Sequence, residues 1–157
     1  MADGQHQAEA SQSQTPKVSS EMDTNSAAAL YLTKVNEERA KVGAPALQSV
    51  PQLVTAAKAK CDDMVEKGYW GHVSPTGKHG YEFVNDQNYP HRRAGENLID
   101  MLGNIDAKSI DAGMTAWNES PSHRAAMIDS DYSLTGIAVC INKEETANYT
   151  VELFVAR

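Results

Sequence analysis

Two apolar stretches at the C-terminal end of the chain constrain its fold most strongly. Residues 133–142 and 148–156 are rich in Val, Ile, Leu and Ala, and the polar residues 143–147 separate them. Apolar runs of this length, bounded by polar turn residues, are typical of neighbouring buried strands. The sequence therefore predicts a C-terminal β-hairpin, against which the rest of the chain has to build a core.

Helical patterns dominate the chain before this hairpin. The second predicted helix opens with Pro51 at a position that favours proline and ends at Gly68. Asp106 is a good N-cap residue for the third long helix. Residues 92–100 are ambiguous, whereas helices are predicted over 27–42, 50–67, 80–88, 105–119 and 121–128. Helices followed by a hairpin indicate an α+β fold.

Length and charge exclude several classes of protein. A chain of 157 residues is expected to form one domain, and its net charge of −7 disfavours nucleic acid and, more weakly, anionic membranes as partners. No apolar run approaches the roughly 20 residues that a membrane-spanning helix needs. Residues 1–26 contain no Leu, Ile, Phe, Tyr or Trp, which predicts a disordered leader or linker before a domain over 27–157.

The two cysteines leave two alternatives open. Cys61 falls on the apolar stripe of the second predicted helix, and Cys140 lies in the first predicted strand of the hairpin. Both are therefore expected in the core, either as free thiols or as a disulfide between helix and strand. Two cysteines at this separation do not form a zinc motif.

Three polar residues carry the candidate chemistry. His72 and His123 each stand beside Gly, Pro or Ser at the end of a predicted element, and Glu96 lies between them in the chain. Two imidazoles and one carboxylate are the side chains from which metal and acid–base sites are built. The alternative is structural: His72 would cap a turn, and Glu96 would accept backbone N–H groups of the nearby loop.

Several motifs together give the chain a family resemblance. They occur in the order Val35–Arg39, Leu53–Met64, Gly68–Gly77, Ala94–Leu98, Ala116–Arg124, Thr135–Val139 and Tyr149–Phe154. In this combination the chain resembles the CAP superfamily of cysteine-rich secretory, antigen-five and pathogenesis-related proteins, most closely its bacterial SCP-like extracellular branch. The resemblance implies an α–β–α sandwich, in which a central antiparallel sheet lies between helical layers and has a further strand at or just after Glu96.

The same resemblance implies a cleft in which His72, Glu96 and His123 meet. Many relatives bind a divalent cation, often Zn²⁺, through the two histidines, and Glu96 would orient one of them or accept a proton from bound water. The second cleft glutamate of animal and plant members is replaced here by Ser120. Glu119 is adjacent, but one helix position turns a side chain by about 100°, so it is expected to point elsewhere.

Three functions from different classes follow from these features. The first is a secreted or cell-envelope module, expected to be a monomer, that binds a lipid, sterol, cell-wall component or protein. The second is a metal-dependent hydrolase, a peptidase, in which His72, Glu96 and His123 are catalytic. The third is a structural or signalling domain with a vestigial cleft. The replacement of the family's second cleft glutamate by Ser120, three residues after Trp117, favours the first over the second.

Overall fold

The structure, a computed structural model, describes residues 22–157. Most of the predicted disordered leader therefore lies outside the described residues. Helix α1 (Thr24–Lys41) starts three positions before the predicted boundary at residue 27, because the Asp23 side chain accepts a 2.7 Å hydrogen bond from the Ser26 N–H. This N-cap satisfies a backbone donor that the first helical turn otherwise leaves without a partner.

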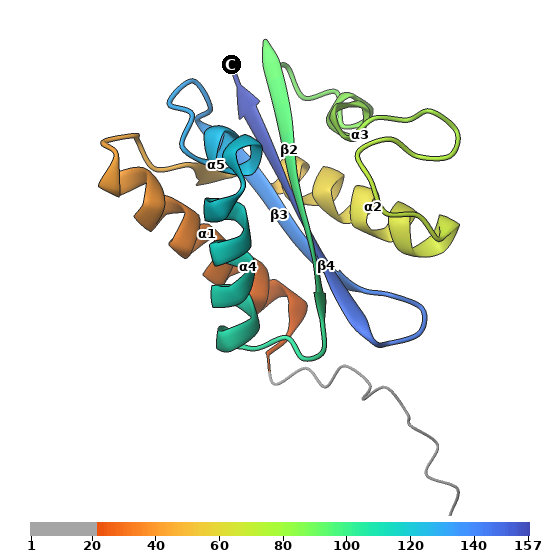
Figure 1. Ribbon diagram of the computed structural model, residues 1–157. Helices are drawn as coiled ribbons and strands as arrows, with labels where there is room; N and C mark the ends of the chain where they lie inside the picture. The colour runs from red at the N-terminus through yellow and green to blue at the C-terminus, as the bar shows by residue number, and fades with distance from the viewer. Residues whose placement is uncertain (1–21) are drawn as a thin grey trace, which may run out of the picture.

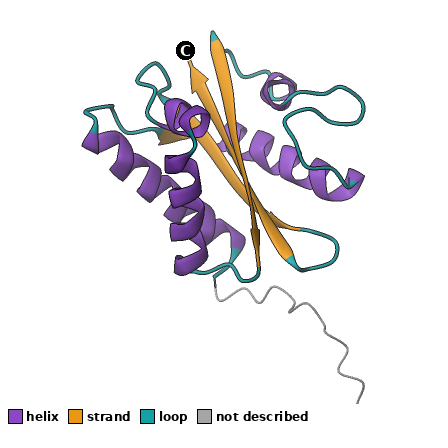
Figure 2. Cartoon of the chain, in the orientation of Figure 1, coloured by secondary structure: helices purple, strands orange, loops and turns teal. Residues whose placement is uncertain are grey.

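Four further helices and four strands complete the fold (Figure 2). The helices lie within two residues of their predicted ends, and the Asp106 cap is formed as expected. They are α2 (Pro51–Lys67), α3 (Gly80–Asp86), α4 (Ala107–Glu119) and α5 (Pro121–Met127). The strands are β1 (Gln48–Ser49), β2 (Arg93–Leu102), β3 (Leu134–Ile141) and β4 (Ala147–Ala156).

The strands form one sheet in the order β1-β3-β4-β2. The predicted hairpin is β3 and β4, and β2 pairs antiparallel with the other side of β4. The central strands pair antiparallel, as expected, and the sheet departs from this only at the two-residue strand β1, which pairs parallel with β3. This two-residue strand arises where the chain enters α2, as the N–H groups of Gln48 and Val50 donate to the carbonyls of Ser133 and Thr135.

Helices cover both faces of the sheet, which confirms the predicted α+β sandwich (Figure 1). On one face α1, α4 and α5 bury a core that includes Tyr31, Trp117 and Phe154. On the other face α2 and α3 bury a second core that includes Leu53, Phe83 and Leu153. Neither core is continuous with the other, because the sheet separates them, so β2 and β4 contribute alternate side chains to each.

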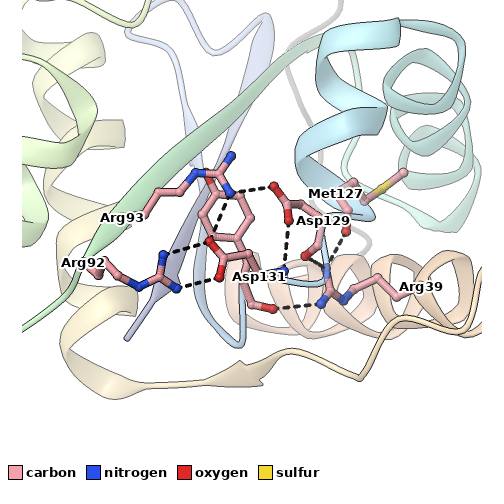
Figure 3. A network of polar contacts seen from close by, with 7 residues as sticks. Arg39, Arg92, Arg93, Met127, Asp129 and Asp131 are labelled. Carbon is pink, nitrogen blue, oxygen red and sulfur yellow. Dashed lines mark hydrogen bonds and ion pairs between the residues drawn. The ribbon is translucent and has the colours of Figure 1, made fainter.

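Two devices tie these layers together. Cys61 of α2 and Cys140 of β3 form a disulfide across 79 positions, so the structure selects the disulfide from the two alternatives. In the other layer the buried Arg39 side chain holds the segment that follows α5, and Arg92 and Arg93 clamp the same segment to the start of β2 (Figure 3). Arg39 donates to the carbonyls of Pro45, Met127, Asp129 and Tyr132.

Candidate functional site

The candidate site lies on β2, where two consecutive residues reach into different helical layers. Side chains alternate between the faces of a sheet, so Glu96 and Asn97 point in opposite directions. Glu96 Oε1 meets His72 Nδ1 at 2.7 Å, and Asn97 Nδ2 donates to the backbone carbonyl of His123 at 2.9 Å. The Glu-Asn pair therefore anchors one histidine segment on each side of the strand.

His72 is held by its backbone as well as by its ring. The buried Lys60 of α2 donates through Nζ to the carbonyls of Gly71 at 2.8 Å and His72 at 3.2 Å. The next residues form a tight loop, in which Val73 bridges to His79 and the Ser74 hydroxyl accepts the N–H of Lys78. The His72 side chain is 59% exposed, whereas Lys60 holds its backbone carbonyl.

The carboxylate of Glu96 is buried, with only 7% of the side chain exposed. Its Oε2 atom has no hydrogen-bond partner within the described part of the chain. This oxygen lies against Gly80 at the start of α3, where an added Cβ would overlap it. A larger residue at position 80 would overlap the Glu96 carboxylate in the position where it contacts His72.

His123 lies in the first turn of α5, close to the corner where α4 ends. Ser120 ends α4 and starts α5, and its hydroxyl lies 2.7 Å from His123 Nδ1. Ser120 thus orients the ring of His123. Glu119, the other residue considered for the cleft, is exposed and is not among the residues that line it.

The two histidines open into one cleft of about 310 Å³. Three residues of β2 line one of its sides, and the loop after α2 and the start of α5 line the others. The lining residues are Trp70, Gly71, His72, Leu98, Ile99, Asp100 and His123. Apolar and polar groups are mixed along it, which is the usual character of a ligand-binding cleft.

The electrostatic settings of the two imidazoles differ. The hydrogen bond that the His72 ring donates to the Glu96 carboxylate, reinforced by the negative charge of Glu96, raises the pKa of His72. Burial lowers the pKa of His123, and the nearby charge of His72 lowers it further. Near neutral pH the second histidine is thus the more readily available in its neutral, metal-binding form.

Each ring has its Nδ1 atom engaged and its Nε2 atom without a hydrogen-bond partner among residues 22–157. An orienting group on one ring nitrogen fixes the tautomer and leaves the other nitrogen for a ligand. In the described range no group of three His, Cys, Asp or Glu side chains is arranged to hold a metal ion. The cleft is therefore lined by two imidazoles, and within the described residues no third His, Cys, Asp or Glu side chain joins them in such a group.

Lys60 and Asn97 were not predicted as site residues, although both position the histidines. Lys60 had a signal in the sequence, because it stands three positions after Ala57 and four before Met64 on the apolar stripe of its helix. A lysine at such a position is rarely buried without a specific partner. Asn97 gave no comparable signal, since its role depends on which way β2 faces.

Comparison with known proteins identifies the family. Residues 32–154 match the sequence profile of the Cysteine-rich secretory protein family, known as CAP. This chain belongs to the CAP family. The uncharacterized protein YkwD of Bacillus subtilis (strain 168) is 29% identical to this CAP domain over 102 residues, which make up 65% of the chain and 38% of YkwD.

Solved structures share the fold. An extracellular SCP-domain protein of Bacillus anthracis str. Ames superposes with a TM-score of 0.73 at 19% identity, over 85% of this chain and 41% of that protein. An outer surface protein of Borrelia burgdorferi gives a TM-score of 0.76 at 20% identity, over 87% of this chain and 96% of that protein. The CAP domain described here thus spans about two fifths of the length of YkwD and of the B. anthracis protein. None of the described helices is long and apolar enough to cross a membrane.

Proposed function

We propose that this CAP domain is an extracellular binding module whose cleft takes a divalent cation, with His72 and His123 as the protein ligands. The observation that carries the proposal is the matched arrangement of the two rings: Nδ1 is held by Glu96 in one and by Ser120 in the other. Both histidines line the same cleft, so their Nε2 atoms are the available ligands. Imidazole nitrogen is a common ligand of Zn²⁺.

The donor set fits weak, exchangeable binding rather than a structural metal site. Structural zinc sites have four protein ligands and catalytic sites three, whereas the described residues of this cleft supply two. Bound there, a divalent cation supplies Lewis acidity and a contact point for an oxygen of the ligand. The chain itself orients the rings, and Trp70, Leu98 and Ile99 provide apolar contacts beside them. A lipid, sterol, cell-wall component or protein is the class of ligand proposed.

The extracellular location is part of the proposal. The disulfide between Cys61 and Cys140 accounts for both cysteines, and disulfides persist in oxidising compartments. The B. anthracis relative is described as extracellular and the B. burgdorferi relative as an outer surface protein. These observations support secretion or attachment at the cell envelope.

A zinc titration followed by NMR tests the cation site. The imidazole signals of His72 and His123 are expected to shift together, whereas those of His79 and His91, which do not line the cleft, stay in place. His72→Ala and His123→Ala should each abolish the shift of the remaining ring, and His91→Ala should not. If neither signal moves at millimolar zinc, the cation site does not exist.

A metal-dependent peptidase is the second candidate, favoured by the direct contact between Glu96 and His72. The replacement of the second glutamate by Ser120 removes one of the two carboxylates that an acid–base pair would use. A peptide-library assay with and without chelator separates the candidates. Cleavage that requires metal and is lost in both His72→Ala and Glu96→Gln would establish the peptidase, and cleavage that survives His72→Ala would come from a contaminant.

A further inference from the structure

The outer edge of β2 is a second feature of the cleft. β2 lies at the end of the sheet and pairs with β4 along its whole length, and no strand within residues 22–157 pairs with its other side. Figure 1 shows β2 in front of the sheet, with α4 and α5 to one side of it and α3 to the other. The edge is therefore framed by both helical layers.

The register shows which backbone groups face this edge. The Gly103 N–H donates to the Thr146 carbonyl at 3.0 Å, and this pair continues the register of β2 with β4. Hydrogen-bonded pairs alternate along antiparallel strands, so the backbone groups of odd-numbered residues of β2 bond to β4 and those of even-numbered residues point outward. Trp117 agrees with this direction, since its Nε1 donates from α4 to the outward carbonyl of Leu98 at 3.0 Å.

The outward groups of two residues coincide with the cleft. The Leu98 N–H and both backbone groups of Asp100 face the free edge, and Leu98, Ile99 and Asp100 line the cleft. Their side chains alternate, with Leu98 packed against the core under α2 and α3 and Ile99 against the core under α1 and α4. One side of the cleft is thus an unpaired strand edge, within the described residues, with a histidine segment on each flank.

From Asp100 onward this edge lacks the features that normally protect an edge strand, whereas at Leu98, which is 5% exposed, Trp117 of α4 covers it. Edge strands are normally protected by lysine, proline, a bulge, an inward-pointing charge or a covering helix, because an open row of N–H and C=O groups pairs with other chains. Residues 94–102 contain no Lys, Arg or Pro, and the register of β2 with β4 is unbroken over ten residues. Glu96, whose inward charge is one such protective feature, lies four positions before Asp100, and beyond Asp100 the residue Leu102 is 82% exposed.

We propose that the ligand of this cleft is an extended polypeptide segment that adds to β2 as a further strand. Its backbone would pair with both outward backbone groups of Asp100, which is exposed. Its alternate side chains would lie against Trp70 and His72 on one flank and against Ile99 and His123 on the other, as in strand addition at other sheet edges. The inference rests on the proposed function, because it assigns the ligand class of the same cleft.

A substitution at Asp100 separates the backbone from the side chain. The probe is a phage-displayed library of random decapeptides, selected on the full chain in the presence of a chelator, and the best peptide is synthesised with a fluorescent label. Asp100→Pro removes an outward N–H and leaves the bonds to β4 intact. It should weaken binding about tenfold or more, whereas Asp100→Asn, which keeps the N–H, should stay within about threefold of the wild type.

N-methylation of the selected peptide gives a readout that needs no protein variant. Methyl groups at alternate residues should abolish binding, and those at the intervening residues should not, because a strand bonds to its neighbour through every second residue. Failure to enrich any peptide, equal binding by Asp100→Pro and wild type, or a methylation profile without this period would overturn the inference. A concentration-dependent dimer that Asp100→Pro dissociates would overturn it as well, since the edge would then belong to a second copy.

The zinc titration keeps the two proposals distinguishable. The peptide selection is carried out in chelator, so it does not depend on cation binding. Imidazole shifts with zinc and no peptide binding would leave the cation site standing and remove the strand partner. Peptide binding without any zinc-induced imidazole shift would support the strand partner and remove the cation site.

Discussion

At the scale of single residues, Glu96 sets the charge of His72. Its hydrogen bond and negative charge raise the pKa of that imidazole, so Glu96→Gln should lower it. The pair stabilises the fold below the ordinary histidine pKa of about 6.5, and this contribution is lost as pH rises through the raised pKa. NMR titration of the His72 ring protons in chelator measures the change. Glu119→Gln, at an exposed carboxylate outside the cleft, is the control, and an equal pKa in all three proteins would contradict the assignment.

Glu152 is a second residue whose protonation state affects the stability of the fold. It is completely buried on β4, and burial raises its pKa to about 8. The Thr135 hydroxyl lies 2.9 Å from Glu152 Oε2 and 2.8 Å from the Leu153 carbonyl, yet it has one hydrogen to donate. A protonated Glu152 resolves this geometry, because it donates to Thr135, which then donates to Leu153.

The pH dependence of stability follows from that proton. A raised carboxyl pKa means that the folded chain binds more protons than the unfolded chain, so stability falls as pH rises from about 4.5 towards about 8. Glu152→Gln keeps a hydrogen-bonding group and removes the titration. Urea unfolding at pH 5 and pH 8 should show a loss of stability in the wild type that is smaller in the variant. Equal losses in the two proteins would show that Glu152 is ionised in the fold at both pH values.

At the scale of elements, periodicity predicted the helices and the hairpin but only part of the sheet. Each helix has one clear apolar face, and β3 and β4 are apolar runs. The local sequence pattern is therefore enough to predict these elements. In β2 the sequence Gly95-Glu96-Asn97 serves two helical layers and a cleft, so no single pattern describes it. The meeting of His72 with Glu96 was implied by the family resemblance, and its geometry depends on Lys60 and Gly80, which belong to the two helices that flank the His72 loop.

The loop that carries His72 depends on helix α2 through Lys60. Lys60→Met removes the donor for the carbonyls of Gly71 and His72, and a buried polar group left without its partner costs about 1–3 kcal/mol. Amide exchange in residues 69–73 should also become faster. The exposed Lys58 of the same helix provides the control, since Lys58→Met should change stability by no more than about 0.5 kcal/mol. Similar stability and exchange in the two variants would contradict the role of Lys60.

At the scale of the whole molecule, the cleft forms where both helical layers reach the same sheet edge. His72 belongs to the layer of α2 and α3, and His123 belongs to the layer of α1, α4 and α5. Strand β2 contacts both segments, through Glu96 on one face and Asn97 on the other. The layers are fastened by separate means. The disulfide fixes α2 to β3 on one side, and Arg39 fixes α1 to the segment after α5 on the other.

The disulfide and Arg39 stabilise separate layers. Loss of the disulfide should therefore lower the stability of the fold and leave the geometry of the site nearly unchanged. The disulfide closes 79 residues of chain, and loss of such a link typically costs about 2–5 kcal/mol, chiefly by freeing the unfolded state. A Cys61→Ala, Cys140→Ala double variant should therefore unfold at lower urea concentration than the oxidised wild type. Its His72 and His123 ring signals should keep their positions and their response to zinc, because neither cysteine lines the cleft. Displaced ring signals in a folded double variant would show that α2 needs the disulfide to hold the His72 loop, and that the two layers do not position the site independently.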